Sequence, residues 1–209
     1  MDARQAYDFW ASLYDSNKNN TRDLEAFALR DTIREKGYRN CLEIGCGTGK
    51  NTQWLADKCN ELTAVDFSIE MLARAREKIT DPKVRFIVAD IIQEWDFATV
   101  SYDLVTFSLV LEHVEFLQPV LKKTFQALEP GGVCYIGELH PFKQYTGTRA
   151  RFDTETGRQV VDCFNHHVSD FTGAAIDAGF QVTDLKEYFD TADHNEIPRI
   201  LVITAKKPF

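Results

Sequence analysis

Three glycines at alternate positions follow a short apolar run in the segment CLEIGCGTGKNT, residues 41–52. Glycine at the end of a buried strand lets the backbone approach a ligand closely, because no Cβ stands in the way. Asp66 ends the second apolar run, about twenty residues after these glycines, where a carboxylate can accept both hydroxyl protons of a ribose. Together these residues predict a site for a ligand that contains a ribose.

The spacing of the glycines argues against two phosphate-binding loops. A P-loop has Gly, four residues and then Gly-Lys-Ser or Gly-Lys-Thr, whereas Gly49-Lys50 follows Ile44 by five positions and precedes Asn51. In the dinucleotide pattern Gly-x-Gly-x-x-Gly the third glycine comes one position later than Gly49. A nicotinamide oxidoreductase is therefore disfavoured, although it would use Asp66 in the same way.

The elements that position these residues alternate between strand and helix patterns. Strands are expected at residues 41–45, 62–67, 84–91, 102–111, 132–140, 180–189 and 199–207. Helices are expected at residues 2–14, 22–37, 50–58, 68–79, 116–128 and 169–179, with Ser68 and Ser169 as N-caps and with Gly37 and Gly179 as ends. In the helix at 22–37, the apolar stripe is Leu24, Phe27, Ala28 and Ile33.

This alternation predicts an α/β fold. We expect a Rossmann-like, seven-stranded, mostly parallel sheet with helices on both faces. The segment DTADHNEIP between the last two strands is too short for a crossover helix, so these strands form a hairpin at one edge and the last strand is antiparallel. Residues 141–165 are read as one long irregular segment, which in a compact domain is typical of a lid or a substrate wall.

Composition limits the classes of function. A length of 209 residues suits one domain, 1–209. The formal net charge of -8 argues against nucleic-acid binding and against adhesion to anionic membranes. We expect no signal peptide, no transmembrane helix and a cytoplasmic location. The five cysteines form no Cys-x-x-Cys pair, and no metal-ligand spacing links the histidines, so no metal is predicted.

Five blocks of sequence carry a resemblance to a known family. LEIGCGTG, AVDFSIEML, VADI, YDLVTFSLVLEHV and LEPGG stand in the order and spacing of the class I S-adenosylmethionine-dependent methyltransferases, over about residues 40 to 140. WASLYDSN, with the Tyr14-Asp15 pair, resembles the first helix of the small-molecule group, which includes the quinone- and menaquinone-biosynthesis type. The resemblance implies a methyltransferase that binds S-adenosylmethionine and a small-molecule substrate, as a monomer or homodimer.

The resemblance also implies a cofactor role for each matching residue. Residues around the methionine part would be Glu43, Gly45, Cys46, Gly47 and Gly49, with Tyr14 folding over the cofactor. Asp66 would hold the ribose hydroxyls, and Ser108 and Leu109 would lie under the methyl-bearing sulfur. The adenine would contact Phe67, Met71, Asp90 and Ile91, although core packing is an equal alternative for Met71.

A general base is needed only if the acceptor atom carries a proton at neutral pH. His140, at the end of the fifth predicted strand, and His166 or His167, before the next helix, are the candidate catalytic bases. Residues 1–37 would form a helical lid and residues 141–165 a substrate-side insertion. The candidate substrate contacts are Tyr7, Trp10, His113, His140, Tyr145, Arg149, Arg151 and His167. For several of them structural roles are equally open: Tyr7 and Trp10 could pin the first helix, and the two arginines could lie on a surface strand edge.

Two further alternatives remain beside the small-molecule enzyme. A methyltransferase for protein or nucleic acid would have the same fold, but no added domain, basic stripe or Asn-Pro-Pro-Tyr-type signature is visible. A partner or cofactor-binding protein that lacks activity would also keep the fold. The acceptor atom and the oligomeric state are not readable from the sequence.

Overall fold

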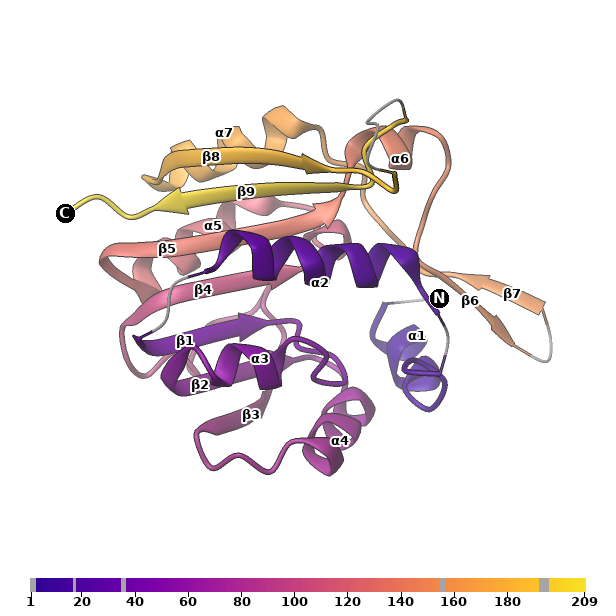
Figure 1. Ribbon diagram of the computed structural model, residues 1–209, viewed down its shortest axis with the longest axis horizontal. Coiled ribbons are helices and arrows are strands. Elements are labelled where there is room, and N and C mark those ends of the chain that lie inside the picture. Colours follow the sequence, from indigo (N-terminus) through magenta and orange to yellow (C-terminus); the bar gives the residue numbers. More distant parts are fainter. Residues whose placement is uncertain (1–2, 17, 35–36, 155–156, 192–195) are drawn as a thin grey trace.

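The computed structural model describes residues 3–16, 18–34, 37–154, 157–191 and 196–209. Its main sheet has seven strands in the order β3-β2-β1-β4-β5-β9-β8 (Figure 1). These are β1 (Tyr38–Ile44), β2 (Cys59–Asp66), β3 (Val84–Val88), β4 (Tyr102–Ser108), β5 (Leu128–Leu139), β8 (Gln181–Tyr188) and β9 (Ile200–Lys206). The first five run parallel, whereas β9 is antiparallel to both β5 and β8. The predicted fold class is confirmed, and the edge strand at this side is β8, not the last strand.

Helices cover both faces of the sheet (Figure 1). They are α1 (Ala3–Trp10), α2 (Asn20–Thr32), α3 (Thr52–Ala56), α4 (Ile69–Lys78), the short 3-10 turn η1 (Leu111–His113), α5 (Leu117–Ala127), α6 (Pro141–Tyr145) and α7 (Val168–Ala178). On one face Leu29 of α2 and Leu55 of α3 pack with Leu104 and Tyr135 of the sheet. On the other face α5 and α7 pack over Phe107 and its neighbours.

Two predicted helix ends are confirmed. Ser68 caps α4, where its hydroxyl accepts the backbone N–H of Met71 at 3.0 Å. Gly179 ends α7 in the left-handed conformation, with φ 105°.

Two other predicted ends are wrong. The second helix stops at Thr32, and Gly37 instead donates its backbone N–H to the carbonyl of Lys58 where β1 begins. The last helix begins one residue before Ser169, and its N-cap is His167, whose backbone N–H donates to the Asp170 carboxylate at 2.7 Å. An acid at the third helical position thus ties the chain to the helix, and a serine cap is not needed.

The segment 141–165 is not irregular throughout, contrary to the sequence prediction. It contains α6 and a two-stranded hairpin of β6 (Arg151–Thr154) and β7 (Gly157–Val160), which projects from the body (Figure 1). Beyond the hairpin, the fully buried Val161 packs with Ala6 and Trp10 of the first helix. The N-terminal helix and this insertion therefore form one cluster, although they are far apart in sequence.

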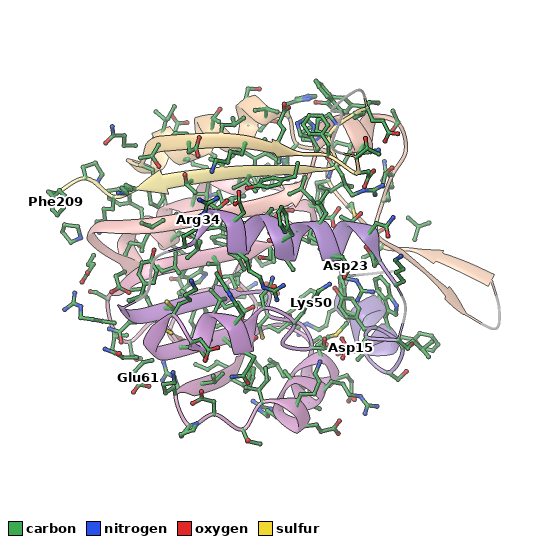
Figure 2. All side chains as sticks on the ribbon, viewed as in Figure 1. Asp15, Asp23, Arg34, Lys50, Glu61 and Phe209 are labelled. Carbon is green, nitrogen blue, oxygen red and sulfur yellow. The ribbon has the colours of Figure 1, made fainter. Side chains whose placement is uncertain are left out.

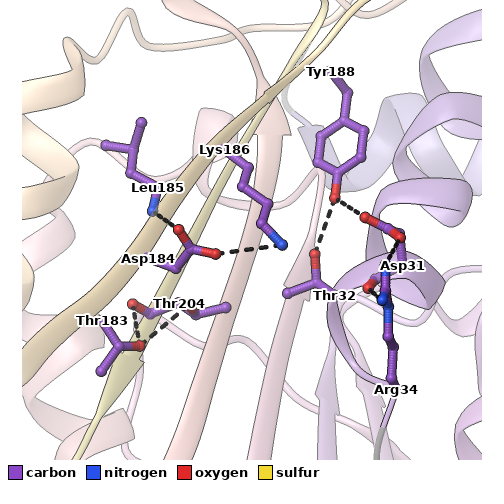
Figure 3. A network of polar contacts seen from close by, with 9 residues as sticks. All are labelled: Asp31, Thr32, Arg34, Thr183, Asp184, Leu185, Lys186, Tyr188 and Thr204. Atoms are coloured by element: carbon purple, nitrogen blue, oxygen red, sulfur yellow. Dashed lines mark hydrogen bonds and ion pairs between the residues drawn. The ribbon is translucent and has the colours of Figure 1, made fainter.

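The edge hairpin is fastened to α2 by polar contacts (Figure 3). The hydroxyl of Tyr188, at the end of β8, lies 3.2 Å from the Thr32 hydroxyl and donates to the Asp31 carboxylate at 2.9 Å. Asp31 also pairs with Arg34. Within the described residues, no helix is both long enough and apolar enough to span a membrane.

Candidate functional site

A cavity of about 490 Å³ opens at the carboxyl ends of the central parallel strands, the edge where open α/β sheets bind ligands. Its volume lies in the usual range for small-molecule sites, about 300–1,000 Å³. Most of the predicted cofactor residues line it: Tyr14, Gly45, Gly47, Asp66, Phe67, Met71, Asp90, Ile91, Ser108 and Leu109. Glu43 and Cys46 line a smaller adjoining hollow of about 50 Å³, which we call the inner hollow.

The glycine loop follows β1 in a backbone conformation that favours glycine. Gly45, Gly47 and Gly49 have φ values of 69°, 54° and 84°. A Cβ on Gly45 would lie 2.3 Å from a methyl of Val110, whereas one on Gly47 would meet nothing within 4 Å. Gly49 lines neither hollow, and a Cβ there would lie 2.6 Å from Ile79. The structure thus gives Gly49 a packing role against the end of α4.

Asp66, at the end of β2, joins the glycine loop to α4. Its Oδ2 accepts the backbone N–H of Gly47 at 2.8 Å, and its Oδ1 accepts that of Ser68 at 2.9 Å. Burial raises the pKa of this carboxyl to about 6, against the opposing effect of the backbone amides. The carboxyl faces the cavity and retains lone pairs that a ribose diol could use.

The inner hollow contains charged groups of both signs. Glu43 accepts the Thr52 hydroxyl at 2.6 Å, and burial raises its pKa to about 8. Glu25, on α2, accepts from Asn51 and Tyr135, both at 3.1 Å, and burial raises its pKa to about 7. When a ligand brings an ammonium group into the inner hollow, its positive charge would favour the ionised form of these carboxyl groups and pair with it.

The cations of the inner hollow come from α2 and from the glycine loop. The Arg22 guanidinium lies 4.0 Å from the centre of the Tyr14 ring and donates to the Tyr14 carbonyl at 2.7 Å. Lys50 pairs with Asp23 at the start of α2 (Figure 2). Cations and buried acids around one small space suit a zwitterion such as the methionine part of S-adenosylmethionine.

Sequence reasoning missed Arg22 and Glu25. The predicted apolar stripe placed Phe27 inward, but its side chain is 57% exposed, while Arg22 and Glu25 are buried. Buried charged residues are rare, so an arginine and a glutamate three positions apart are normally assigned to the solvent face. The signal that could have revealed them is their position on the face of the fully buried Leu29, with Glu25 one turn and Arg22 two turns before it.

The adenine end of the cavity is formed by the segment after β3. Asp90 accepts the backbone N–H of Ile92 at 3.1 Å and pairs with Arg4 of α1 at 3.4 Å. Lys123, on α5, donates to the carbonyl oxygens of Ile91 and Ile92 at 3.1 and 3.0 Å. Lys123 was not predicted as a site residue. Its ammonium group holds this segment in place by bonding the segment's backbone carbonyl oxygens.

Another part of the cavity wall is formed by Tyr7, His113 and the end of β4. The Tyr7 hydroxyl lies 2.9 Å from His113 Nε2, and both side chains line the cavity. Leu109, beside them, has φ 59°, a conformation that is uncommon for a non-glycine residue and is enriched at functional sites. Of the predicted substrate contacts whose side chains the structure describes, only Tyr7 and His113 line the cavity, as do Ser108 and Leu109.

The three predicted catalytic histidines lie outside the cavity. His140 is fully buried at the N-cap of α6, where Nε2 bonds Glu187 at 2.9 Å and Nδ1 accepts from the Phe142 backbone. His166 is buried and its Nε2 bonds the Val114 carbonyl at 2.7 Å. His167 caps α7 and bonds the Tyr145 hydroxyl. Each ring thus has a structural partner that the sequence could not show.

Two further predicted substrate contacts, Trp10 and Arg149, do not line the cavity. Trp10 is buried behind Tyr7, with their rings stacked 5.8 Å apart. Arg149 is exposed, and the side chain of Arg151 lies outside the described part of the structure. Among the described residues, Glu112, His113 and Cys163 form one group whose donor atoms lie within 4.8 Å of one another, close enough to hold a metal ion.

Comparisons with known proteins agree with this geometry. Residues 42–136 match the family model described as a methyltransferase domain. The malonyl-[acyl-carrier protein] O-methyltransferase of Priestia megaterium is 38% identical over 60% of this chain and 41% of its own length. The trans-aconitate 2-methyltransferase of Deinococcus radiodurans is 31% identical over 68% of this chain and 54% of its own length.

A solved structure extends the similarity to the whole chain. The DhpI–SAH complex superposes with a TM-score of 0.76 at 22% identity and covers 99% of this chain and 95% of that one, which is a similarity of fold. The chain spans about half the length of the curated relatives that it matches.

Proposed function

The chain carries a class I S-adenosylmethionine-dependent methyltransferase domain, and we propose that the protein transfers a methyl group from S-adenosylmethionine to a small-molecule acceptor. The observation that carries this proposal is that the main cavity and the inner hollow adjoin each other. The cavity contains Asp66, a carboxylate placed to accept the hydroxyl groups of a ribose, and the inner hollow beside it contains both buried acids and cations. Adenosine joined to a zwitterionic tail matches that combination.

The residues of the chain would bind and orient the cofactor. Asp66 would hold the ribose, Asp90 the adenine amino group, and Glu43 with Glu25 the ammonium group of the tail. Arg22 would face the carboxylate of the tail, which the sequence did not predict. When bound, S-adenosylmethionine supplies a methyl group that is already activated by its sulfonium, so the protein need supply no nucleophile.

The main catalytic task is then to position the acceptor and exclude water. Such positioning can account for about 7–11 kcal/mol of a barrier. The first helix would act as a lid, since Tyr7 and Tyr14 line the cavity and Asp8 accepts the Ser68 hydroxyl at the start of α4 at 2.5 Å. The segment 141–165 would complete the wall through Asp162 and Phe164.

A small-molecule substrate is supported by the name of one relative, the trans-aconitate 2-methyltransferase, while the name of the malonyl-[acyl-carrier protein] O-methyltransferase indicates a small acyl group carried on a protein. The narrower quinone-biosynthesis subgroup stays a prediction. The chain would act without nucleic-acid or membrane partners, in keeping with its net charge of -8.

Two measurements test the function. Calorimetry with S-adenosylhomocysteine tests the site alone, and saturable binding at one site per chain is expected. Mass spectrometry of a metabolite extract incubated with methyl-labelled S-adenosylmethionine then tests transfer, and a labelled product below about a kilodalton is expected. Label on macromolecules alone would refute the small-molecule proposal. Binding without label in any extract would favour the alternative of a partner protein that keeps the fold but lacks the activity.

A further inference from the structure

Two side chains from distant parts of the sequence meet at one end of the cavity. Tyr7 comes from α1 and His113 from the turn after β4, with 2.9 Å between the hydroxyl and Nε2. Both line the cavity beside Ser108 and Leu109. The stacked ring of Trp10, 5.8 Å behind Tyr7, fixes the tyrosine in place. The contact is therefore a built feature of the cavity wall.

The hydrogen bonds of His113 determine where its proton lies. Nδ1 is 3.1 Å from the backbone carbonyl of Asp162, and a carbonyl can only accept, so Nδ1 carries the proton. A neutral imidazole in this tautomer presents the lone pair of Nε2 to the Tyr7 hydroxyl, which donates to it. Burial, with Tyr14 and Glu112 nearby, raises the pKa of Tyr7 well above its usual value, so the hydroxyl keeps its proton.

Two side chains, Glu112 and Cys163, lie beside the His113 ring. Glu112, on the same turn, has a carboxyl oxygen 3.8 Å from Nε2. Cys163, from the segment after β7, has its sulfur 3.8 Å from Nδ1, and burial raises its pKa to about 12, so it stays a neutral thiol. Arg149 is near enough to Cys163 to affect that thiol electrostatically, but it is exposed.

Near His113, the cavity-lining side chains that the structure describes include no counter-charge for an anionic acceptor. Among the described side chains that line the cavity, Arg4 is the only cation, and it pairs with Asp90 at the adenine end. Asp162 and Phe164 complete the wall near His113. A carboxylate would meet no cation there, whereas an uncharged planar molecule with a hydroxyl would meet an aromatic wall and a hydrogen-bonding base.

Resting on the proposed methyltransferase function, we propose that His113, acting through the Tyr7 hydroxyl, is the general base for an acceptor that is a phenol or an enol. The acceptor hydroxyl gives its proton to the Tyr7 oxygen while the proton of Tyr7 passes to Nε2 of His113. The acceptor oxygen forms its bond to the methyl carbon as the carbon–sulfur bond breaks, and the positive charge lost at sulfur appears on the imidazolium. Glu112 stabilises that imidazolium.

A binding experiment tests the proton transfer apart from catalysis. The probe is 4-nitrophenol, whose ionised form absorbs at longer wavelength, added with S-adenosylhomocysteine at about pH 6, just below the usual pKa of histidine. The wild-type protein should bind the probe mainly as the phenolate. In His113→Gln and Tyr7→Phe, the ratio of bound phenolate to bound phenol should fall at least about tenfold, one pKa unit.

The matched control is Tyr188→Phe, which removes a hydroxyl that bonds Thr32 and Asp31 on α2 and does not line the cavity. It should behave as the wild type. Calorimetry with S-adenosylhomocysteine should show saturable binding at one site per chain for all four proteins, which shows that they are folded. If the probe does not bind, or ionises equally in the wild type and His113→Gln, the proposal is overturned.

A second experiment tests the substrate class with methyl-labelled S-adenosylmethionine, substituted phenols of graded acidity, and the matching benzoates. Phenols should be methylated in preference to benzoates. His113→Gln should slow weakly acidic phenols by about 10²–10⁴-fold and strongly acidic ones far less, because those are already ionised. Methylation of benzoates but not phenols would overturn the proposal. So would stoichiometric zinc that is lost in Cys163→Ser, since His113 would then be a ligand. Failure of the wild type to bind S-adenosylhomocysteine would instead refute the proposed function itself.

Discussion

The carboxylate of Asp66 accepts the backbone N–H of Gly47, with 2.8 Å between Oδ2 and the nitrogen. Asp66, the last residue of β2, therefore fixes the glycine loop that follows β1. This contact explains why an acid at this position serves the site even before a ligand arrives. It also means that a substitution at Asp66 changes both the glycine loop and the proposed ribose contact.

Asp66→Asn should weaken S-adenosylhomocysteine binding by about 1–3 kcal/mol, because an amide cannot accept hydrogen bonds on both sides. This loss corresponds to roughly 5- to 150-fold in affinity by calorimetry. The matched control is Asp103→Asn. Asp103 also accepts two backbone N–H groups, from Arg39 and Asn40, but at the opposite end of the strands. Equal loss of affinity in both variants would show that Asp66 acts only through stability.

A second prediction separates two glycines of the loop. Gly49→Ala should destabilise the protein by about 1–3 kcal/mol, because its Cβ would overlap Ile79 at a backbone angle of 84°. Gly47→Ala should cost about 1–2 kcal/mol of stability, because a residue with a Cβ is strained at φ 54° even though that Cβ meets nothing within 4 Å, and it should also lower affinity for S-adenosylhomocysteine. Thermal unfolding and calorimetry on both variants check this. An affinity loss confined to Gly49→Ala would contradict it.

The strands, their order of appearance and the glycine loop were predictable because apolar periodicity and turn residues are local signals. Asp66 and Asp90 were found for the same reason, as each follows a strand whose end must reach the ligand edge. The choice among histidines was not predictable. His140 and His113 both follow parallel strands, and only tertiary contacts bury the first ring against Glu187 and bring the second to Tyr7.

Arg22 and Glu25 escaped sequence reasoning for a different physical reason. Patterns assign charged residues on a helix to solvent, since burying an unpaired charge is costly. In the fold, Arg22 lies against the Tyr14 ring and Glu25 accepts two hydrogen bonds, so the cost is offset by partners from other elements. Such partners cannot be read from one helix alone.

Stability should depend on pH through buried carboxyl groups, two of them in the inner hollow and a third, Glu138, on β5. Burial raises the pKa of Glu25 to about 7 and those of Glu43 and Glu138 to about 8, above their ordinary value of 4.5. The folded protein therefore binds more protons than the unfolded chain in this window, and its stability falls as pH rises from about 4.5 to 8. Thermal unfolding of the ligand-free protein should show the melting temperature decreasing over that range.

The ligand should reverse part of this dependence, because its ammonium group would pair with ionised Glu43. The rise in melting temperature caused by S-adenosylhomocysteine is expected to be larger at the alkaline end of the window. Glu43→Gln should flatten the ligand-free profile. A melting temperature that increases with pH in the ligand-free protein would show that these carboxyl groups are ionised and paired.

The lid can be tested at Asp15, which accepts the Thr48 hydroxyl and the Lys78 ammonium, both at 2.6 Å. Asp15→Asn should speed the release of S-adenosylhomocysteine several-fold in stopped-flow experiments, and it should change stability by at most about 1 kcal/mol, as for exposed ion pairs. Asp31→Asn is the control, since Asp31 also binds one hydroxyl and one cation but lies between α2 and β8 (Figure 3). Equal release rates in the wild type and Asp15→Asn would argue against a gating role for the first helix.

The assignment of the inner hollow to the methionine tail can be tested with two ligands that differ only there. S-adenosylhomocysteine has the amino-acid tail, whereas methylthioadenosine has the same adenosine and sulfur without it. Arg22→Met keeps the length and apolar stem of the side chain against the Tyr14 ring but removes the charge. Its affinity for S-adenosylhomocysteine should fall by about 1.5–3 kcal/mol, the range for hydrogen bonds to charged groups, while its affinity for methylthioadenosine should stay as in the wild type.

Arg30→Met is the matched control for that experiment, because Arg30 lies on the same helix with its guanidinium 5.9 Å from the ring centre of Trp54 and lines neither hollow. It should leave both affinities unchanged. If Arg22→Met weakened both ligands equally, the arginine would act by holding the Tyr14 segment in place, through its hydrogen bond to the Tyr14 carbonyl. A loss specific to the tail would instead assign the carboxylate to Arg22, and the ammonium would then lie on the side of Glu43 and Glu25, where the structure places its buried acids.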